Sequence, residues 1–330
     1  ASGCADCSQC CSIAHMNFLP PSLLEHRVLE LRIPYSTQCS SVTCVDSIEG
    51  VEASASSRQT NSDSDDDDLN SDEDLEDADA GLHVQTIRVR TLPVAGSIGG
   101  KLWDSSLLMG AWLFESSHLF PQSAEVGARR PRLLELGSGL GVAGLAAAAA
   151  FPSLHVTLSD YDPAVLHNLH ENIRLNFPSL VDQEQRLDVT PVDFRDFTKA
   201  AAATQPLSPE LQKYEDAGLY GQVDMIIGAD VVYDIGHNQL AQVCLSLLAQ
   251  PPEYGTCWRP CAVFLLPDGR PRLRDFVNEL VRAGLTCRIE RILPSCPMVR
   301  RLRQAREGWG AGASFSLYFV TRAESCESST

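Results

Sequence analysis

From residue 132 onward, hydrophobic and polar residues follow two alternating patterns, one with the period of a β-strand and one with the period of a helix. Short apolar runs predict strands at residues 132–137, 155–160, 186–194, 223–230, 261–267, 285–293 and 314–322. Apolar residues at helical spacing predict helices at residues 141–151, 163–176, 238–250 and 272–284. Because strand and helix alternate, the pattern predicts an open, mostly parallel seven-stranded sheet with helices on both faces.

The two ends of this pattern differ from its middle. No apolar pattern of helix length separates residues 285–293 from residues 314–322, so we predict that the sheet finishes with an antiparallel last strand. Upstream, residues 83–94 alternate as a half-buried strand does, and residues 101–114 have apolar positions at helical spacing. A further short strand fits within residues 23–35.

Charge is distributed unevenly along the 330 residues. Residues 63–79 contain 11 acidic and no basic residues, which accounts for most of the net charge of −17. We expect the surrounding segment, residues 53–83, to be disordered, because it is rich in Ser and Asp and poor in apolar residues. The rest of the chain carries a net charge of only −6, since 11 of the 17 excess negative charges lie in this run, so nucleic-acid binding through a broad basic face is not expected.

The first 52 residues form a Cys- and Ser-rich arm. Four of the 12 cysteines are clustered near its start, namely Cys4, Cys7, Cys10 and Cys11. A zinc site needs four converging ligands, usually in two spaced pairs, and the second pair is missing unless Cys39 and Cys44 supply it. We therefore expect reduced thiols and no metal site. No secretory leader and no apolar run of about 20 residues is recognisable, which favours a cytoplasmic location, with the nucleus as the alternative, and no membrane contact.

The stretch "LLELGSGLGVAG" contains the strongest local signal for a ligand site. An apolar strand runs into Gly137, Gly139 and Gly141, and a predicted helix follows at once. Glycines in this position let the backbone turn sharply and approach a ligand, and the helix N-terminus presents free N–H groups. Because Gly139, Gly141 and Gly144 also fit G-x-G-x-x-G, a dinucleotide site is one interpretation of the loop.

Two carboxylates near this loop bear on the choice of ligand. Glu135 lies two residues before the first glycine, where it can bind the cationic ammonium of S-adenosylmethionine, a group that a dinucleotide lacks. Asp160 ends the next strand, where an acid commonly binds ribose hydroxyls in both kinds of site. Glu135 therefore favours S-adenosylmethionine, and Asp160 is compatible with either ligand.

A third polar strand end lies in "GADVVYD". The apolar run from residue 223 closes on Asp230, and Tyr233 follows three residues later. Alone, these residues are typical of a helix cap and a half-buried aromatic ring. The carboxyl ends of parallel strands meet at one edge of a sheet, so together with the glycine loop they indicate a functional site.

These motifs resemble the seven-β-strand, S-adenosylmethionine-dependent methyltransferases. More narrowly, the chain resembles methyltransferase family 16, which contains many protein-lysine methyltransferases. The resemblance covers about residues 84–322 and is carried by "GGKLWDSSLLMGAWL", "LLELGSGLGVAGL", "LSDYDP", "VDF" and "GADVVYD". It implies a Rossmann-like methyltransferase domain over residues 84–322, followed by a disordered tail at residues 323–330.

The resemblance also implies roles for individual residues. It implies that Trp103 packs near the cofactor and that the methionine-binding loop is Gly137, Ser138 and Gly139. It also implies that Asp160 is the ribose acid and that the backbone of Ala229 borders the cofactor. Where the family usually has an acid followed by Trp near the adenine, this chain has Asp193 and Phe194, and Phe can still stack. With Glu135 and Gly141, these form the expected cofactor site.

The "DVVY" segment matches the D-x-x-Y signature of the lysine-modifying members. The resemblance therefore implies an in-line methyl transfer to the ε-amine of a lysine in a protein substrate. We also expect the enzyme to act as a monomer. Asp230 would orient the amine and Tyr233 would line its channel. Open alternatives are a histidine or small-molecule acceptor, a non-catalytic cofactor-binding interaction protein and, more distantly, a dehydrogenase, which would need a second nucleotide half.

Overall fold

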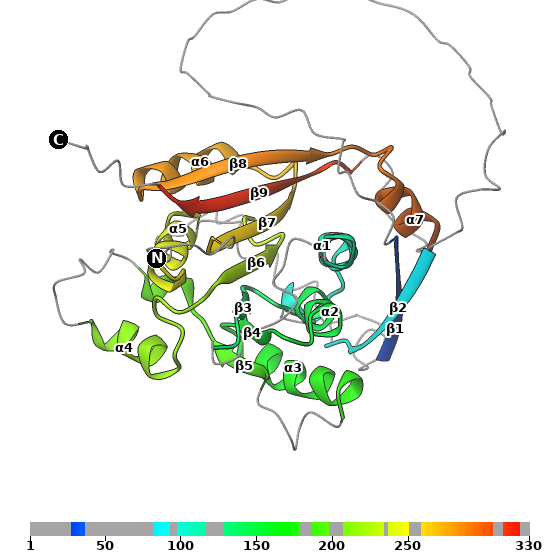
Figure 1. Cartoon of the computed structure of the whole chain (residues 1–330), viewed down its shortest axis with the longest axis horizontal. Helices are drawn as coiled ribbons and strands as arrows, with labels where there is room; N and C mark the ends of the chain where they lie inside the picture. Colours follow the sequence, from blue (N-terminus) through cyan, green and yellow to red (C-terminus); the bar gives the residue numbers. More distant parts are fainter. Residues whose placement is uncertain are drawn as a thin grey trace, which may run out of the picture.

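The computed structural model describes residues 28–36, 82–92, 98–116, 129–178, 186–197, 207–233, 237–250, 259–305 and 313–323. Its centre is a seven-stranded sheet with the strand order β5-β4-β3-β6-β7-β9-β8 (Figure 1). The strands are β3 (Arg132–Glu135), β4 (His155–Asp160), β5 (Leu187–Pro191), β6 (Met225–Ala229), β7 (Cys261–Pro267), β8 (Leu285–Ile292) and β9 (Phe315–Arg322). The predicted open, Rossmann-like sheet is thereby confirmed.

Strand direction also follows the prediction. The pairs β3–β4, β3–β6, β4–β5 and β6–β7 are parallel, whereas β9 runs antiparallel to both of its neighbours, β7 and β8. The sequence pattern did not indicate that the last strand lies between β7 and β8.

A helix between the last two strands contradicts the sequence-based expectation. Helix α7 (Pro297–Ala305) follows β8, in a segment where the pattern predicted no helix. Its apolar stripe is only three residues, Met298, Val299 and Leu302, with arginines between and around them, so the helical period is too short to recognise. These three residues are buried because α7 packs against β1 and α1 rather than against the large sheet (Figure 1).

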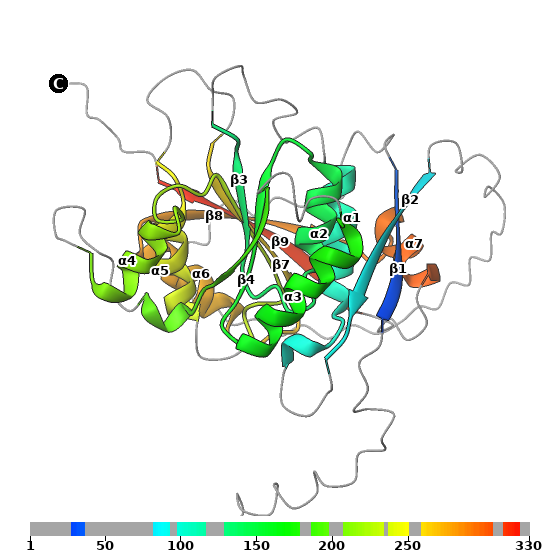
Figure 2. The ribbon, with the colours of Figure 1, turned by 90° about the horizontal axis from the view of Figure 1, so that it is seen from below.

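Helices cover both faces of the sheet, as Figure 2 shows. One face carries α1 (Asp104–Glu115), α2 (Val142–Ala150) and α3 (Pro163–Asn176), and the other carries α4 (Pro209–Asp216), α5 (His237–Leu247) and α6 (Leu273–Arg282). Neighbouring residues of β3 face opposite cores, since Leu133 belongs to the first apolar cluster and Leu134 to the second. Burial on both faces explains why these strands are apolar throughout.

A separate antiparallel pair, β1 (Val28–Ser36) and β2 (Leu82–Arg90), lies outside α1 and α2. It contributes Ile33, Ile87 and Val89 to the same core as those helices, so the strand expected within residues 23–35 is confirmed. The clustered N-terminal cysteines, the acidic run at 63–79 and most of the two segments expected to be disordered, 53–83 and 323–330, lie outside the described residues. The expectation is wrong at Leu82 and His83, which belong to β2 because their backbones pair with β1. It is also wrong at Ala323, whose N–H donates to the Gly284 carbonyl at 3.3 Å. No helix in the described ranges is long and apolar enough to cross a membrane.

Candidate active site

A cavity of about 700 Å³ lies at the carboxyl ends of β3, β4, β5 and β6. Of the twelve residues that the sequence singled out, eleven line it: Trp103, Glu135, Gly137, Ser138, Gly139, Asp160, Asp193, Phe194, Ala229, Asp230 and Tyr233. The parallel strands account for the convergence of all but Trp103, because each of the other ten residues follows or ends a strand at the same edge of the sheet. Trp103 reaches the cavity from the N-terminus of α1. Gly141 does not line the cavity.

The glycine loop forms the floor of the cavity at the end of β3. Gly139 has a φ of 53°, and a Cβ built there would lie 3.1 Å from the carbonyl oxygen of Gly99. Gly141 has a φ of 78° and begins α2, where a Cβ would meet Leu169 Cδ2 at 2.7 Å. Gly139 therefore allows a close approach beside the cavity, while the glycine at 141 serves the turn and the packing of α2 on α3.

Glu135 lies at the end of β3 and is buried. Its Oε2 accepts a hydrogen bond of 3.0 Å from the Gly144 N–H, near the start of α2. Burial raises the pKa of Glu135 to about 8, because desolvation disfavours the charged carboxylate. A cationic group bound in the cavity would stabilise the ionised form, so Glu135 is suited to a ligand that carries a positive charge.

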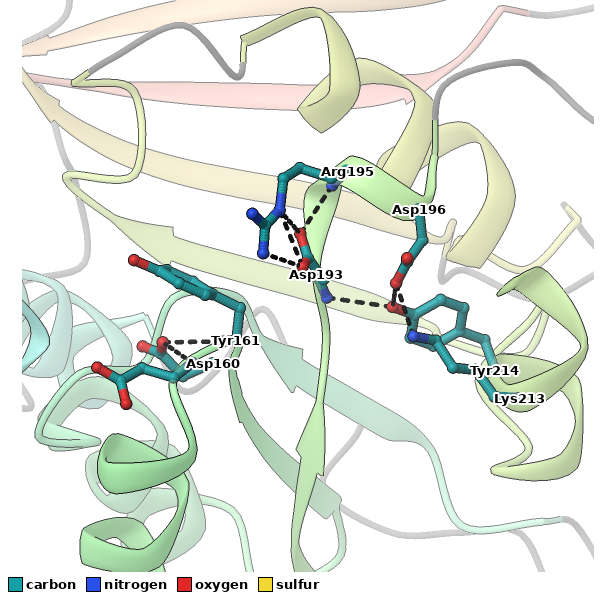
Figure 3. Close-up of polar contacts among 8 residues, drawn as sticks. Asp160, Tyr161, Asp193, Arg195, Asp196, Lys213 and Tyr214 are labelled. Carbon is teal, nitrogen blue, oxygen red and sulfur yellow. Dashed lines mark hydrogen bonds and ion pairs between the residues drawn. The ribbon is translucent and has the colours of Figure 1, made fainter. Parts of the chain in front are cut away.

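Asp160, at the end of β4, is also buried and is fixed by three backbone N–H groups. Tyr161 and Asp162 donate to its Oδ1 at 2.8 and 3.1 Å (Figure 3). Gly139 donates to its Oδ2 at 3.2 Å. Burial raises the pKa of Asp160, and the three hydrogen bonds oppose this effect. A carboxylate held in this way has acceptor capacity left for ribose hydroxyls.

The wall after β5 is formed by the 3-10 turn η6 (Phe194–Asp196) and the residue before it, Asp193. Arg195 binds both oxygens of Asp193, with Nε at 2.9 and 3.0 Å and Nη2 at 2.6 Å, and this lowers the pKa of Asp193 (Figure 3). The Arg195 guanidinium also lies 5.6 Å from the ring centroid of Tyr161, a cation–π contact at the cavity edge. Neither Arg195 nor Tyr161 was predicted as a site residue from the sequence.

Helix α4 supports this wall from behind. The Tyr214 hydroxyl accepts a hydrogen bond of 3.1 Å from the Asp193 N–H and donates one of 2.5 Å to Asp196 Oδ2 (Figure 3). Lys213 Nζ lies 2.7 Å from the same Asp196 oxygen. Burial raises the pKa of Tyr214, so its hydroxyl keeps the proton that it donates.

Asp230 follows β6 and has an unusual backbone and a partner that the sequence did not indicate. Its φ is 59°, a left-handed conformation, and its side chain is buried. Arg270, in the turn after β7, donates from Nε to Oδ1 at 2.7 Å and from Nη2 to Oδ2. Because β7 is the parallel neighbour of β6, the turn after β7 lies beside Asp230. The sequence of that turn, "PDGR", is the feature that could have indicated an arginine next to Asp230.

Aromatic residues complete the mouth of the cavity. Trp103, the N-cap residue of α1, is 37% exposed, and its Nε1 donates to the Ile98 carbonyl at 3.2 Å. Tyr233 is 43% exposed. The Arg270 guanidinium lies 5.9 Å from the centroid of the Trp103 ring, so Asp230, Arg270 and Trp103 form a contiguous group.

The cavity fits S-adenosylmethionine in the chemistry of its residues. Glu135 matches a cationic amino group, Asp160 matches a ribose diol, and Phe194 provides an aromatic ring at the end of β5. The left-handed glycine at position 139, where a side chain would fill the space beside Gly99, leaves room for close backbone approach.

Comparison with known proteins gives two kinds of match. A family model described as lysine methyltransferase matches residues 85–258. The protein-lysine N-methyltransferase EEF2KMT of Homo sapiens is 30% identical over 196 residues, covering 59% of this chain and 53% of the relative. The same-named protein of Mus musculus is 28% identical over 197 residues, covering 58% and 51%. The chain thus spans about half the length of these curated relatives.

Solved structures align more distantly. A putative S-adenosylmethionine-dependent methyltransferase from Streptococcus mutans aligns with a TM-score of 0.43 and 12% identity, covering 71% of this chain and 53% of that one. TYW2 from P. horikoshii, in complex with MeSAdo, aligns with a TM-score of 0.40 and 15% identity, covering 71% and 67%. At these low TM-scores the alignments do not bear on what this chain does.

Proposed function

Because the chain belongs to the lysine methyltransferase family, we propose that it is an S-adenosylmethionine-dependent enzyme that methylates the ε-amine of a lysine in a protein substrate. The observation that carries the proposal is the convergence of three buried carboxylates from three strand ends, Glu135, Asp160 and Asp230, on one cavity. Burying carboxylates is costly unless they are paired or have a binding role. Here the first two are suited to the cofactor, and the third lies where the acceptor would enter.

The proposed cofactor contacts follow the order of the strands. Glu135 would hold the cationic amino group, and Asp160 would accept hydrogen bonds from the ribose. Phe194 would stack on the adenine, with Asp193 beside it, and the loop around Gly139 would pass close to the ligand. Trp103 and Ala229 would close the cavity on the acceptor side.

When bound, S-adenosylmethionine supplies an activated methyl group, and attack by a neutral amine forms the N–C bond as the C–S bond breaks, leaving S-adenosylhomocysteine. A free lysine has a pKa near 10.4 and arrives as an ammonium, so its proton must first pass to water. Both oxygens of Asp230 already accept hydrogen bonds from Arg270, so Asp230 is not assigned the role of base. We therefore assign orientation of the acceptor to Asp230 and formation of the channel to Tyr233.

The cofactor assignment is tested by thermal shift. S-adenosylhomocysteine should raise the melting temperature of the chain and NAD should not, because a ligand stabilises only the protein that binds it. Glu135→Gln should weaken the S-adenosylhomocysteine effect, while Asp230→Ala should leave it largely intact. Stabilisation by NAD alone would contradict the proposal.

The acceptor assignment is tested by transfer. The chain is incubated with labelled S-adenosylmethionine and a lysate of its host, and modified residues are mapped by mass spectrometry. The expected result is label on a lysine of a protein, lost with Asp230→Ala. Label on histidine, or only in the metabolite fraction, would point to the alternative acceptors, and binding without any transfer would point to a non-catalytic interaction protein.

The remaining expectations belong to the same proposal. The enzyme would act as a monomer, without nucleic acid, in the cytoplasm or the nucleus. Light scattering should give the mass of one chain at micromolar concentration, and a stable dimer mass would contradict the monomer.

A further inference from the structure

The carboxylate proposed to face the acceptor amine already has a cation bound to it. Arg270 donates to both oxygens of Asp230, through Nε at 2.7 Å and through Nη2, which is a bidentate geometry. The Asp230 side chain is 6% exposed and that of Arg270 is 32% exposed, and both residues line the cavity.

Both partners are held in place by their backbones. The Asp230 N–H donates to the Leu265 carbonyl at 2.9 Å, which ties the residue to β7. The Arg270 N–H donates to the Pro267 carbonyl at 3.1 Å, closing the turn after that strand. Within the turn, Asp268 accepts a hydrogen bond of 2.7 Å from the Ser316 hydroxyl of β9. The guanidinium is therefore a fixed part of the cavity wall.

A fixed guanidinium changes what Asp230 can do for an incoming lysine. An opposite charge within about 4–6 Å typically shifts a pKa by 1–3 units towards the charged form, and a like charge opposes the charged form. A free Asp230 would hold a lysine as the ammonium, which cannot attack a methyl group. The charge of Arg270 offsets that attraction, and its Nε and Nη2 each occupy one hydrogen-bonding position on a carboxylate oxygen of Asp230.

On this basis we propose that Arg270 is a positioning residue that keeps Asp230 from stabilising a bound ammonium, so that the acceptor lysine is held as the neutral amine. Its proton passes to water before transfer, and Asp230 keeps only its orienting role. The inference rests on the proposed function, because it takes the Asp230 end of the cavity as the acceptor end. In this proposal Arg270, which lies outside the D-x-x-Y segment, controls the protonation state of the acceptor.

Other charged groups around the cavity do not account for this control. Lys101 adds positive charge, while Glu135 and Tyr233 are the remaining titratable groups outside the adenosine side. On the adenosine side, Asp193 is paired with Arg195, and Asp160 is bound by backbone N–H groups and lies beside Asp162 and Tyr161. All of these are unchanged in an Arg270 variant, so a difference from the wild-type chain isolates the guanidinium.

The test uses n-butylamine as the probe for a lysine side chain. Its affinity is measured by NMR titration of the full chain, saturated with S-adenosylhomocysteine, at several pH values between 7 and 10. For the wild-type chain we expect affinity to rise with pH, following the neutral amine. For Arg270→Gln we expect binding at pH 7.5 at least about tenfold tighter than wild type and a flatter pH dependence, because one unit of pKa is a factor of ten.

Two further variants make the result specific. Arg272→Gln removes an exposed charge from the same turn without altering the cavity lining, and it should behave as wild type. Asp230→Asn keeps the guanidinium but removes the carboxylate, so it should bind the probe at pH 7.5 more weakly than the wild-type chain. Because this shift is measured against the wild type and is opposite to that of Arg270→Gln, the inference stays testable if one variant fails to fold.

Several outcomes would overturn the inference. Equal or weaker binding of the probe by Arg270→Gln at pH 7.5, with an unchanged pH dependence, would show that Arg270 does not suppress ammonium binding. If neither protein binds the probe at any pH, the acceptor amine does not bind at the Asp230 end of the cavity. The outcome is separate from the lysate experiment, since the probe measures protonation at the cavity whether or not a protein lysine acquires label.

If transfer is observed, kinetics give a second readout. Arg270→Gln should lower KM at pH 7.5, lower kcat, and move the rise of kcat to a pH at least about one unit higher. A merely structural loss would lower kcat at every pH without recovery under alkaline conditions.

Discussion

Replacement of Tyr214 by Phe tests whether α4 holds the adenosine wall of the cavity. The change removes one hydroxyl from a buried ring and leaves the ring packed against Phe197, at a centroid separation of 4.8 Å. The Asp193 N–H then loses its acceptor, and Asp196 loses its 2.5 Å hydrogen bond but keeps Lys213.

The expected loss follows from these two hydrogen bonds. A hydrogen bond to a charged group contributes about 1.5–3 kcal/mol, and a buried donor left without a partner costs about 1–3 kcal/mol. Because Lys213 still binds Asp196 and water can reach the half-buried Asp193, we expect the free energy of unfolding to fall by about 2 kcal/mol. Freer motion of Asp193 and Phe194 should also weaken S-adenosylhomocysteine binding by up to about tenfold, equivalent to about 1.4 kcal/mol.

Urea denaturation measures the first effect and calorimetric titration with S-adenosylhomocysteine measures the second. Tyr220→Phe is the matched control, because Tyr220 lies close by in the chain, is half-buried and does not line the cavity. An unchanged urea midpoint for Tyr214→Phe would refute the proposed support by α4. A loss of stability with full cofactor affinity would separate support of the fold from support of the site.

Three further predictions address other parts of the molecule. Gly139→Ala should weaken S-adenosylhomocysteine binding at least about tenfold, because the left-handed backbone and the nearby carbonyl strain any side chain there; Gly269→Ala, which has no atom within 4 Å of the added Cβ, should not. The pKa of Glu135 is raised from 4.5 to about 8 in the folded chain, so its contribution to stability is fully present below about pH 4.5 and is lost as the pH rises through 8. The melting temperature of the ligand-free chain should therefore decline over this pH range. The Glu135→Gln variant should not show this decline. Leu302→Ala should lower the free energy of unfolding, measured by urea denaturation, by about 2–4 kcal/mol, because it removes buried apolar contacts of α7. The control variant Val281→Ala changes a side chain that is 62% exposed, and it should lower the free energy of unfolding by less than about 0.5 kcal/mol.

The cavity lining also shows which kind of residue was predictable. Glu135, Asp160 and Asp230 were identified because each ends or directly follows a buried apolar strand, and parallel strands bring such ends to one sheet edge. Gly141 was assigned to the cofactor site because it belongs to the same glycine motif, yet it supports the start of α2. A motif specifies the course of the backbone, and which of its residues meet the cavity depends on the packing around it.

The alternation of strands and helices, the parallel sheet and the glycine loop were predictable from the chain alone, because they follow from local periodicity and from backbone conformations that only certain residues adopt. Three features depend on contacts between distant parts of the chain: the position of β9 between β7 and β8, the docking of α7 on β1, and the pairing of Arg270 with Asp230. The last of these joins residues 40 positions apart, on turns after different strands. No local pattern encodes such a contact, since it depends on which strands are neighbours and on where their following turns meet.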